Sequence, residues 1–406
     1  MNKSVFEPGR ELQVSDNTEV LVAGGGIAGM AAAIAAARGG AKVTMIEREY
    51  CLGGMATLGL VTIYLPLDDG LGNQVIYGIG EELLKLSIKH GAEANYPKVW
   101  REGGTLEERQ KMRYITQFNP HIFALEAEKL LCELGVEILY GTLAAGVVKD
   151  GDRITGVIVE NKSGRSVIGC QAVVDCTGDA DIAHLAGAPT ALHEGGNGLA
   201  SWYYYNTKGK TSLKMFGLAD LPAEPEPRKD GDDPYGNVTV AALTNTRFSG
   251  VDGPELSKAV IEAHGKMFED ILEHKKDDPE YVPVTISTIP LVRMSRRIVG
   301  EYAQDDTESR VYIEDSIGLT GDWRKHGPCY ELPYRGLYTK SVPNLIMAGR
   351  DISVTDAMWD ITRVIPVCAV TGEAAGTAAA MTKDFPALDV KKLQEKLQEN
   401  GVKIHI

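Results

Sequence analysis

Apolar and polar residues in the first fifty positions predict a strand, a helix and a second strand in close succession. The run Val20–Ala23 is short and wholly apolar, as a buried strand requires. Small residues, mostly alanine, fill Met30–Arg38 and predict a tightly packed helix. A second run, Lys42–Ile46, predicts the next strand. Two strands joined by such a helix form a βαβ unit with parallel strands.

Three glycines occupy the turn between the first strand and the helix. Gly24, Gly26 and Gly29 have the spacing G-x-G-x-x-G, and Glu47 follows the second strand. In a dinucleotide-binding unit the first glycine makes a tight turn, the second lets the backbone approach a pyrophosphate, and the third lets helix and strand pack closely. The helix N-terminus offers unpaired N–H groups to phosphates. A carboxylate about 20 residues further on accepts the ribose hydroxyls.

A glycine-rich helix start can also serve tight packing alone, and the glycine spacing without its context is a weak signal. Here the strand, the turn, the helix, the second strand and the terminal acid coincide within one βαβ unit. The sequence therefore favours nucleotide binding over packing alone.

The next stretch predicts a helix followed by antiparallel strands. Phe118–Leu134 has a helical apolar period and leads to a strand at Val136–Tyr140. Turn residues then separate three runs, which predicts an antiparallel meander. These runs are Leu143–Lys149, Arg153–Glu160 and Arg165–Cys170. A return strand, Ala172–Asp175, completes the expected nucleotide-binding domain.

The amino-acid composition of the chain changes between Gly195 and about Pro290. Prolines and charges in Leu221–Pro234 predict a loop or lid. Ordered elements are expected at Trp202–Tyr205 (a strand or the wall of an aromatic pocket), Val260–Lys276 (an amphipathic helix), Val282–Leu291 (a strand) and Val390–Asn400 (a surface helix).

Three later features favour FAD over NAD, which shares the same ADP half. A Gly53–Gly54 turn lets the chain pass close to an extended cofactor. Two strands end in Thr177–Asp179 and Gly349–Asp351, where small residues and carboxylates suit the hydroxyls of a ribityl chain that NAD lacks. A helix rich in small residues follows Arg363, and its positive N-terminal end could stabilise negative charge on a reduced flavin.

With these motifs the chain resembles the glutathione-reductase-type FAD oxidoreductases over residues 20–188 and 295–381. The resemblance implies an α/β fold with a Rossmann-type FAD/NAD(P)-binding domain, a β-meander and a separate substrate or cap domain. Ala56 and Thr57 stand where histidine-linked relatives place their histidine, so noncovalent FAD is expected. The implied FAD contacts are Gly24, Gly26, Ile27, Ala28, Gly29, Glu47, Arg48, Gly54, Met55, Ala144 (through its backbone, at the adenine), Gly178, Asp179, Gly349, Asp351, Pro366 and Val367.

A chain of 406 residues exceeds a single compact core, so we expect two domains. The expected FAD-binding domain comprises residues 1–62, 118–190 and 336–385, the substrate or cap domain residues 63–117 and 191–335, and the C-terminal helix and tail residues 386–406.

The composition of the chain limits the kinds of partner that it can bind. Hydrophobic residues make up 44% and charged residues 24% of the chain, as in ordinary globular proteins. A net charge of −14 argues against a nucleic-acid partner and against an anionic membrane surface. The N-terminus has no apolar signal-peptide core, and the apolar window Val20–Ala37 carries the glycine turn, so a cytoplasmic protein without a membrane span is expected. The expected partners are a small-molecule substrate and an electron donor or acceptor of unspecified kind; a homo-oligomer is left open.

The six cysteines form no C-x-x-C pair, which removes the simplest zinc, iron–sulfur and dithiol sites. We expect no metal, and buried, reduced thiols. Cys51 precedes Gly53 by two residues, where dithiol reductases carry a redox cysteine. Because no second cysteine lies nearby in the sequence, a structural role is favoured.

Flavin supplies the redox chemistry, so the protein must position the substrate, manage a proton and stabilise charge. Arg363 is the first catalytic candidate, because it precedes the helix that the resemblance places beside the flavin pyrimidine. The alternative for Arg363 is an ion pair with Asp356 or Asp360, and the sequence does not decide between the two.

Two further residues are catalytic candidates. Arg297 ends the run Arg293–Arg297, where an arginine could hold an anionic substrate bidentately or fix the cap to the FAD domain by an ion pair. The ion pair is slightly favoured. His326 could exchange a proton with the substrate, although a lone loop histidine is more often only solvent-exposed.

These observations predict hydride transfer between a carbon of a small polar substrate and flavin N5. Arg363 and Arg297 would orient the substrate, and His326 would exchange the proton. A flavin-dependent oxidase or monooxygenase that uses O2, and a non-catalytic FAD-binding subunit, stay open as alternatives. Only one nucleotide-binding motif is present, which disfavours a disulfide-reductase layout with a second site for NAD(P)H.

Overall fold

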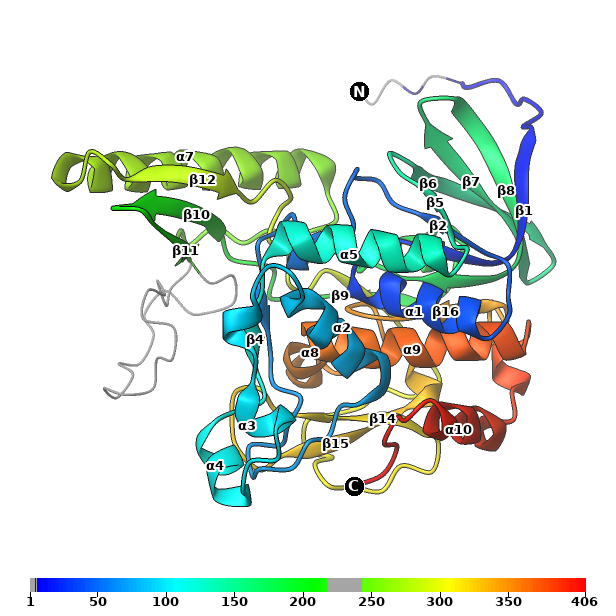
Figure 1. The fold of residues 1–406 in the computed structure, drawn as a ribbon. Coiled ribbons are helices and arrows are strands. Elements are labelled where there is room, and N and C mark those ends of the chain that lie inside the picture. Colours follow the sequence, from blue (N-terminus) through cyan, green and yellow to red (C-terminus); the bar gives the residue numbers. More distant parts are fainter. Residues whose placement is uncertain (1–3, 5, 218–242) are drawn as a thin grey trace.

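The computed structural model describes residues 4, 6–217 and 243–406. The loop predicted at Leu221–Pro234 lies outside the described residues. The described chain forms a large body and a smaller lobe that projects from it (Figure 1).

A seven-stranded sheet forms the centre of the large body. Its order is β5-β2-β1-β8-β7-β6, and β16 pairs with the last part of β8. Five strands (β5, β2, β1, β8 and β16) run parallel, while β7 and β6 continue from β8 as an antiparallel meander. This confirms the predicted βαβ unit and meander. The bounds are β1 (Val14–Ala23), β2 (Val43–Ile46), β5 (Glu137–Leu139), β6 (Leu143–Asp150), β7 (Arg153–Asn161), β8 (Gly164–Asp175) and β16 (Leu345–Met347).

One predicted boundary is wrong. The runs Arg165–Cys170 and Ala172–Asp175, expected as two strands, are both parts of β8. Gln171 separates them in the sequence, but it is a single exposed position between buried neighbours, and the pairing with β1 continues on both sides of it. The first part of β8 pairs with β7 and the last part with β16, while β1 runs along both.

Helices α1 (Ile27–Arg38) and α9 (Ile365–Met381) pack against each other beside the sheet (Figure 1). Small residues make this contact close. A Cβ added to Gly372 would lie 2.3 Å from the Ala28 carbonyl oxygen, and one on Gly376 would lie 2.1 Å from the Ala32 carbonyl oxygen. The helix predicted after Arg363 is therefore confirmed as a core helix.

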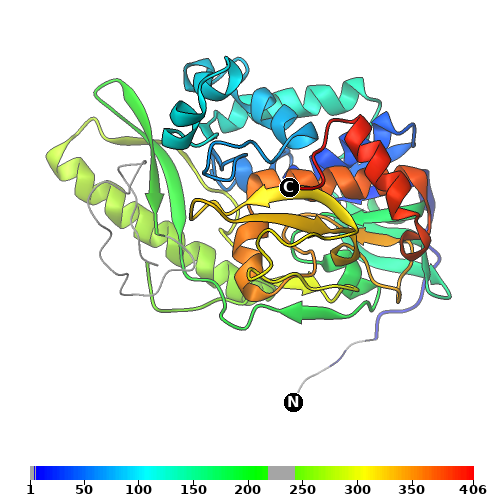
Figure 2. The ribbon, with the colours of Figure 1, turned by 90° about the horizontal axis from the view of Figure 1, so that it is seen from below.

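Shorter elements surround these two helices. The remaining helices of the large body are α2 (Gly78–Ile88), α3 (Lys98–Arg101), α4 (Leu106–Lys111), α5 (Pro120–Glu133), α6 (Asp181–Leu185), α8 (Asp356–Thr362) and α10 (Val390–Glu399). Its short strands are β3 (Ile63–Tyr64), β4 (Thr116–Gln117), β9 (Thr190–Leu192), β13 (Arg296–Ile298), β14 (Ser316–Gly321) and β15 (Cys329–Pro333). Figure 2 shows α10, the predicted C-terminal helix, lying on α9.

The smaller lobe consists of a three-stranded sheet with one long helix against it. The sheet order is β11-β10-β12. The predicted strand at Trp202–Tyr205 is confirmed as part of β10, and the predicted helix at Val260–Lys276 is confirmed within α7. The bounds are β10 (Ser201–Thr207), β11 (Lys210–Phe216), β12 (Val282–Ile286) and α7 (Gly253–Asp277). Two small apolar clusters of its own, around Tyr203 and around Phe248, hold this lobe together.

The strand predicted at Val282–Leu291 is shorter than expected, because the chain leaves the lobe after Ile286. The Thr288 amide donates to the Leu58 carbonyl oxygen at 3.0 Å, so the segment after β12 crosses to the large body. Residues of the predicted cap region outside the lobe, such as Tyr64, Tyr114 and Ile317, belong to the large apolar core. The domain boundaries given above stay a prediction.

All six cysteines are free of disulfide bonds, and four of the six are buried. Cys132 contradicts the expectation of burial. It follows the buried Leu131 on α5, and one residue turns the side chain by about 100° around a helix, onto the solvent side. Cys51 is half-buried, and burial raises the pKa of its thiol, as a structural thiol would show.

In the part of the chain that the structure describes, no single helix is long and apolar enough to span a membrane. Helices α8 and α9 meet the length and composition criteria only as a pair, bent by 90° at the break between them.

Glu373 is a buried carboxyl group within α9. Its Oε2 accepts a hydrogen bond of 2.8 Å from the amide of Ile79 at the start of α2. Burial raises the pKa of Glu373 to about 8, and the bond from Ile79 opposes this only in part. The folded chain therefore binds this proton more tightly than the unfolded chain does.

We predict that Glu373 makes the stability of the protein depend on pH. Its contribution is full below the ordinary carboxyl value of 4.5 and is lost as the pH rises through about 8. Each unit of pKa shift corresponds to about 1.4 kcal/mol. In urea unfolding between pH 4.5 and 9, Glu373→Gln should reduce the loss of stability with rising pH. The Glu107→Gln control, whose side chain is 77% exposed, should keep the wild-type slope, and equal slopes for all three proteins would contradict the prediction.

Candidate active site

The glycine turn after β1 has the geometry that a dinucleotide site requires. Gly24 has a φ of +103°, which favours glycine, and a Cβ on Gly29 would lie 1.8 Å from the Gly24 carbonyl oxygen. A Cβ on Gly26 would meet nothing within 4 Å. The first and third glycines are thus required by the fold, whereas the second faces open space where a phosphate could approach.

The second glycine turn lies directly against the first. The Gly53 amide donates to the Gly25 carbonyl oxygen at 2.8 Å, and a Cβ on Gly54 would lie 3.5 Å from the Gly26 Cα. Gly54 and Met55, predicted to contact FAD, therefore lie beside the first turn of α1 with Ile27 and Ala28.

Glu47 lies at the end of β2, next to the same turn. It is buried, and its Oε2 accepts a hydrogen bond of 2.7 Å from the amide of Gly25. Burial raises the pKa of Glu47, while backbone hydrogen bonds to its carboxylate oppose the shift. Its position in contact with the glycine turn is the one expected for a ribose ligand.

The predicted adenine contact lies beyond Glu47. The Thr142 amide donates to the Glu47 carbonyl oxygen at 3.0 Å, and Ala144 follows two residues later on β6. Arg48 is exposed at the rim and lies 3.8 Å from the Glu49 carboxylate. These residues mark one end of the candidate site.

Asp351 lies at the other end, after β16. Its Oδ2 accepts a hydrogen bond of 3.2 Å from the amide of Gly178, which follows β8. Its Oδ1 is buried and has no hydrogen-bond partner within the described part of the chain. Burial raises the pKa of this carboxyl well above its ordinary value. A buried oxygen without a partner is costly and indicates a missing donor, such as a ligand hydroxyl.

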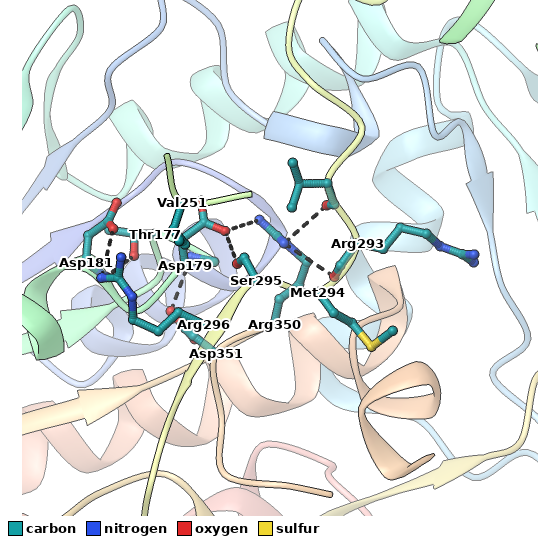
Figure 3. Close-up of polar contacts among 12 residues, drawn as sticks. Thr177, Asp179, Asp181, Val251, Arg293, Met294, Ser295, Arg296, Arg350 and Asp351 are labelled. Carbon is teal, nitrogen blue, oxygen red and sulfur yellow. Dashed lines mark hydrogen bonds and ion pairs between the residues drawn. The ribbon is translucent and has the colours of Figure 1, made fainter. Parts of the chain in front are cut away.

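Asp179 is bound by side chains from two other segments, and its predicted contact with FAD stays a prediction. Figure 3 shows its carboxylate accepting from the Ser295 hydroxyl and from Arg350, whose Nη2 lies 3.3 Å away. Arg350 also donates to the carbonyl oxygens of Val292 and Arg293. Asp179 and Arg350 together therefore fix the segment that enters from the lobe onto the strand ends.

The N-terminus of α9 lies at the same end as Asp351. The Gly349 amide donates to the Thr371 hydroxyl at 3.0 Å, which ties the end of β16 to α9. Pro366 and Val367 are buried in the first turn of the helix. Val364 at its N-cap has no polar side chain, and neither has Gly26 at the N-cap of α1, so both helix ends can offer backbone N–H groups to a ligand.

Arg363 joins α8 to α9. Its Nε lies 3.1 Å from Asp360 Oδ1, and the guanidinium is almost completely buried. The predicted ion pair with Asp360 is therefore present. It also fixes the guanidinium beside the N-terminus of α9, so it is compatible with the predicted role toward a substrate.

The other two catalytic candidates come from other elements of the fold than Arg363 does. Arg297 Nη1 lies 2.8 Å from Asp356 Oδ1, and its guanidinium carbon lies 4.6 Å from the centre of the Trp359 ring. Arg297 therefore forms an ion pair, which was one of its two predicted roles. His326 lies in the exposed turn between β14 and β15. No contact between Arg297 and the other two candidates is found in the described structure, and the three catalytic assignments stay predictions.

Sequence reasoning missed Arg324 and Trp323, which lie just before His326. Arg324 Nη1 is 3.0 Å from Asp360 Oδ2, and Trp323 donates from Nε1 to the Asp360 carbonyl oxygen at 3.0 Å. They bring the turn between β14 and β15 to the corner between α8 and α9. Nothing in the local sequence indicates this contact, because the partners are 36 residues apart.

Comparison with known proteins agrees with this geometry. Residues 19–230 and 213–397 match the family described as FAD dependent oxidoreductase. The chain belongs to this family. It is therefore an oxidoreductase with FAD as its cofactor and a mixed α/β fold with a Rossmann-like sheet. The narrower glutathione-reductase type stays a prediction.

Individual relatives of this FAD dependent oxidoreductase are distant. Digeranylgeranylglycerophospholipid reductase of Picrophilus torridus is 33% identical over 159 residues, which are 36% of this chain and 36% of the relative. The match thus spans about a third of that protein's length.

Two solved structures are also similar. A geranylgeranyl bacteriochlorophyll reductase-like protein from Thermoplasma acidophilum has a TM-score of 0.45 and 14% identity, with 95% of this chain and 83% of that chain covered. p-Nitrophenol 4-monooxygenase from Pseudomonas putida has a TM-score of 0.47 and 12% identity, with 96% and 82% covered. At these TM-scores the two likenesses carry no argument about function.

The first prediction from the site separates fold from cofactor binding in the glycine turn. Gly26→Ala should leave the melting temperature of the apoprotein unchanged and weaken FAD binding about tenfold or more, equivalent to at least about 1.4 kcal/mol. Gly29→Ala should lower the melting temperature itself, because its methyl group would overlap the Gly24 carbonyl. FAD affinity is measured by flavin fluorescence. Wild-type FAD affinity in Gly26→Ala would contradict the assignment.

The second prediction compares two buried carboxyl groups. Asp351→Ala should weaken FAD binding and change apoprotein stability little, because one of the two carboxyl oxygens has no partner to lose. Asp175→Ala should destabilise the apoprotein by about 1–3 kcal/mol or more, because this carboxyl accepts bonds from Thr177 and Ala183. Calorimetry and FAD titration of both variants provide the test. A larger stability loss in Asp351→Ala than in Asp175→Ala would be inconsistent with an open ligand position.

Proposed function

We propose that this FAD dependent oxidoreductase transfers a hydride between a carbon of a small polar substrate and N5 of noncovalently bound FAD. The order of the strand ends supports this. Glu47 follows β2, Gly26 follows β1, and Asp351 follows β16, so the groups suited to ribose, pyrophosphate and ribityl chain succeed one another along one edge of the sheet. Beyond Asp351 the edge leads to the N-terminus of α9 and to Arg363.

Bound FAD supplies the hydride acceptor or donor, and the residues of the chain supply position and charge. Asp360 holds the Arg363 guanidinium beside the N-terminus of α9, where it can orient a polar group of the substrate. The backbone N–H groups at that helix end oppose negative charge that develops next to them. His326, in an exposed turn, can exchange a proton with solvent.

The smaller lobe is proposed to contribute to substrate binding. Its chain returns to the large body past Leu58, where Leu291 lies 3.2 Å from the position of a Cβ on Gly59. The same segment continues to Arg293 and is fixed by Arg350. The segment that leaves the lobe therefore contacts both the chain after the second glycine turn and Arg350, which precedes Asp351.

We predict that Arg363 is needed for substrate-dependent flavin reduction. Anaerobic mixing with a panel of hydroxy acids, sugars and amino acids should bleach the visible flavin band, and enoates should restore it after photoreduction. Arg363→Gln should slow the reaction about a hundredfold, equivalent to about 2.7 kcal/mol, with FAD still bound. Arg335→Gln, which breaks an ion pair with Asp315 elsewhere, is the matched control.

Bleaching of Arg363→Gln at the wild-type rate would remove Arg363 from the proposal. If no substrate bleached the flavin anaerobically, whereas a substrate consumed O2 with the reduced protein, an oxygen-using reaction would replace hydride transfer.

A further inference from the structure

Residues 58–62 follow the second glycine turn, and they receive hydrogen bonds from the smaller lobe and from the chain that leaves it. The Tyr204 hydroxyl oxygen, on β10, lies 2.6 Å from the Thr62 hydroxyl oxygen. The Thr288 amide, just after β12, donates to the Leu58 carbonyl oxygen at 3.0 Å. We call residues 58–62 the bridging segment, because the lobe meets the large body there.

The bridging segment is also bonded to two of the predicted FAD contacts. The Leu58 amide donates to the Gly54 carbonyl oxygen at 2.8 Å, and the Val61 amide donates to the Met55 carbonyl oxygen at 3.0 Å. Gly54 in turn lies against the first glycine turn, since a Cβ on Gly54 would be 3.5 Å from the Gly26 Cα. A continuous series of direct contacts therefore runs from the lobe to the turn where the pyrophosphate of FAD is expected.

The backbone of the bridging segment is strained at its middle residue. Leu60 has a φ of +58° although it is not a glycine, and its side chain is buried. A left-handed backbone at a residue with a large side chain costs free energy and persists only where the surrounding contacts enforce it. The contacts of the lobe fall on Leu58 and Thr62, on either side of Leu60. The lobe therefore helps to enforce this conformation against a less strained alternative.

The direction of the Tyr204 side chain follows from the alternation along β10. Tyr203 and Tyr205 lie on the face toward the core of the lobe, where the Tyr203 hydroxyl is 2.8 Å from that of Tyr281 and the Tyr205 ring stacks on Tyr281. Tyr204 lies on the opposite face and reaches the buried Thr62. Burial raises the pKa of Tyr204, so its hydroxyl stays protonated and can donate.

We infer that Tyr204 is a positioning residue for FAD. Through its hydrogen bond to Thr62, it holds the bridging segment in the conformation that places Gly54 and Met55 beside the first glycine turn. FAD binding and the seating of the lobe are then coupled, and because such coupling is reciprocal, bound FAD also stabilises the contact between the lobe and the large body. This role goes beyond the proposed function and needs no substrate.

The test measures how fast the holoenzyme releases FAD after dilution, from the rise in flavin fluorescence. Tyr204→Phe should release FAD about three- to tenfold faster than wild type, as the net contribution of one hydrogen bond would give. Thr62→Val should have the same effect, whereas Thr62→Ser keeps the hydroxyl and should release FAD at the wild-type rate. The variant with both Tyr204→Phe and Thr62→Val should be no faster than the single variants, because both changes remove the same bond.

Tyr203→Phe is the matched control. It removes the same group from the neighbouring residue of β10, but this hydroxyl bonds to Asp270 and Tyr281 within the lobe. FAD release should stay at the wild-type rate, even if the melting temperature falls. Equal acceleration in Tyr203→Phe and Tyr204→Phe would attribute the effect to lobe stability and overturn the inference. Wild-type release from Tyr204→Phe would also overturn it, as would effects of Tyr204→Phe and Thr62→Val that add in the double variant.

The release assay contains no substrate, so its outcome is separate from that of the bleaching assay. Fast release from Tyr204→Phe together with a flavin that no substrate bleaches would remove hydride transfer and support the role of Tyr204. Substrate-dependent bleaching together with wild-type release from Tyr204→Phe would leave hydride transfer in place and overturn that role.

Discussion

The site depends on one constraint, which is that parallel strands end at a common edge. Because β2, β1, β8 and β16 all run in the same direction, the residues after each strand meet there, although they are up to about 300 positions apart in the sequence. This edge brings Glu47, the glycine turns and Asp351 into one line. The close packing of α1 on α9 then fixes two helix N-termini toward the same line.

Small residues are what make this arrangement possible. Gly29 allows α1 to start against β1, and Gly372 and Gly376 allow α9 to approach α1 so closely that a single added methyl group would collide with backbone oxygen. Larger side chains there would push α9, and with it Arg363, away from the strand ends. The close packing of α9 on α1 therefore also determines the position of Arg363, the proposed catalytic arginine.

Much of the fold, and the position of the candidate FAD-binding residues within it, could be predicted from the sequence, because both depend on local patterns. The spacing of Gly24, Gly26 and Gly29, and the strands before and after them, are properties of neighbouring residues. The full length of β8 could not be predicted from the sequence, because it depends on pairing with strands on both sides of β8. Arg324 was missed for a related reason: its contact with Asp360 arises only when the turn between β14 and β15 folds onto α8. Arg297 and Arg363 both had an ion-pair alternative that sequence spacing cannot exclude.

The smaller lobe is joined to the large body only by the chain before β10 and the chain after β12, among the connections that the described residues show. Such a two-stemmed insertion can diverge, lengthen or be exchanged between relatives while the electron-carrying scaffold stays intact. Under the proposed role of the lobe in substrate binding, selectivity and redox chemistry can then evolve at different rates. Arg350 holds the chain after β12, so a lobe exchanged between relatives would have to keep the hydrogen bonds from Arg350 to the Val292 and Arg293 carbonyl oxygens.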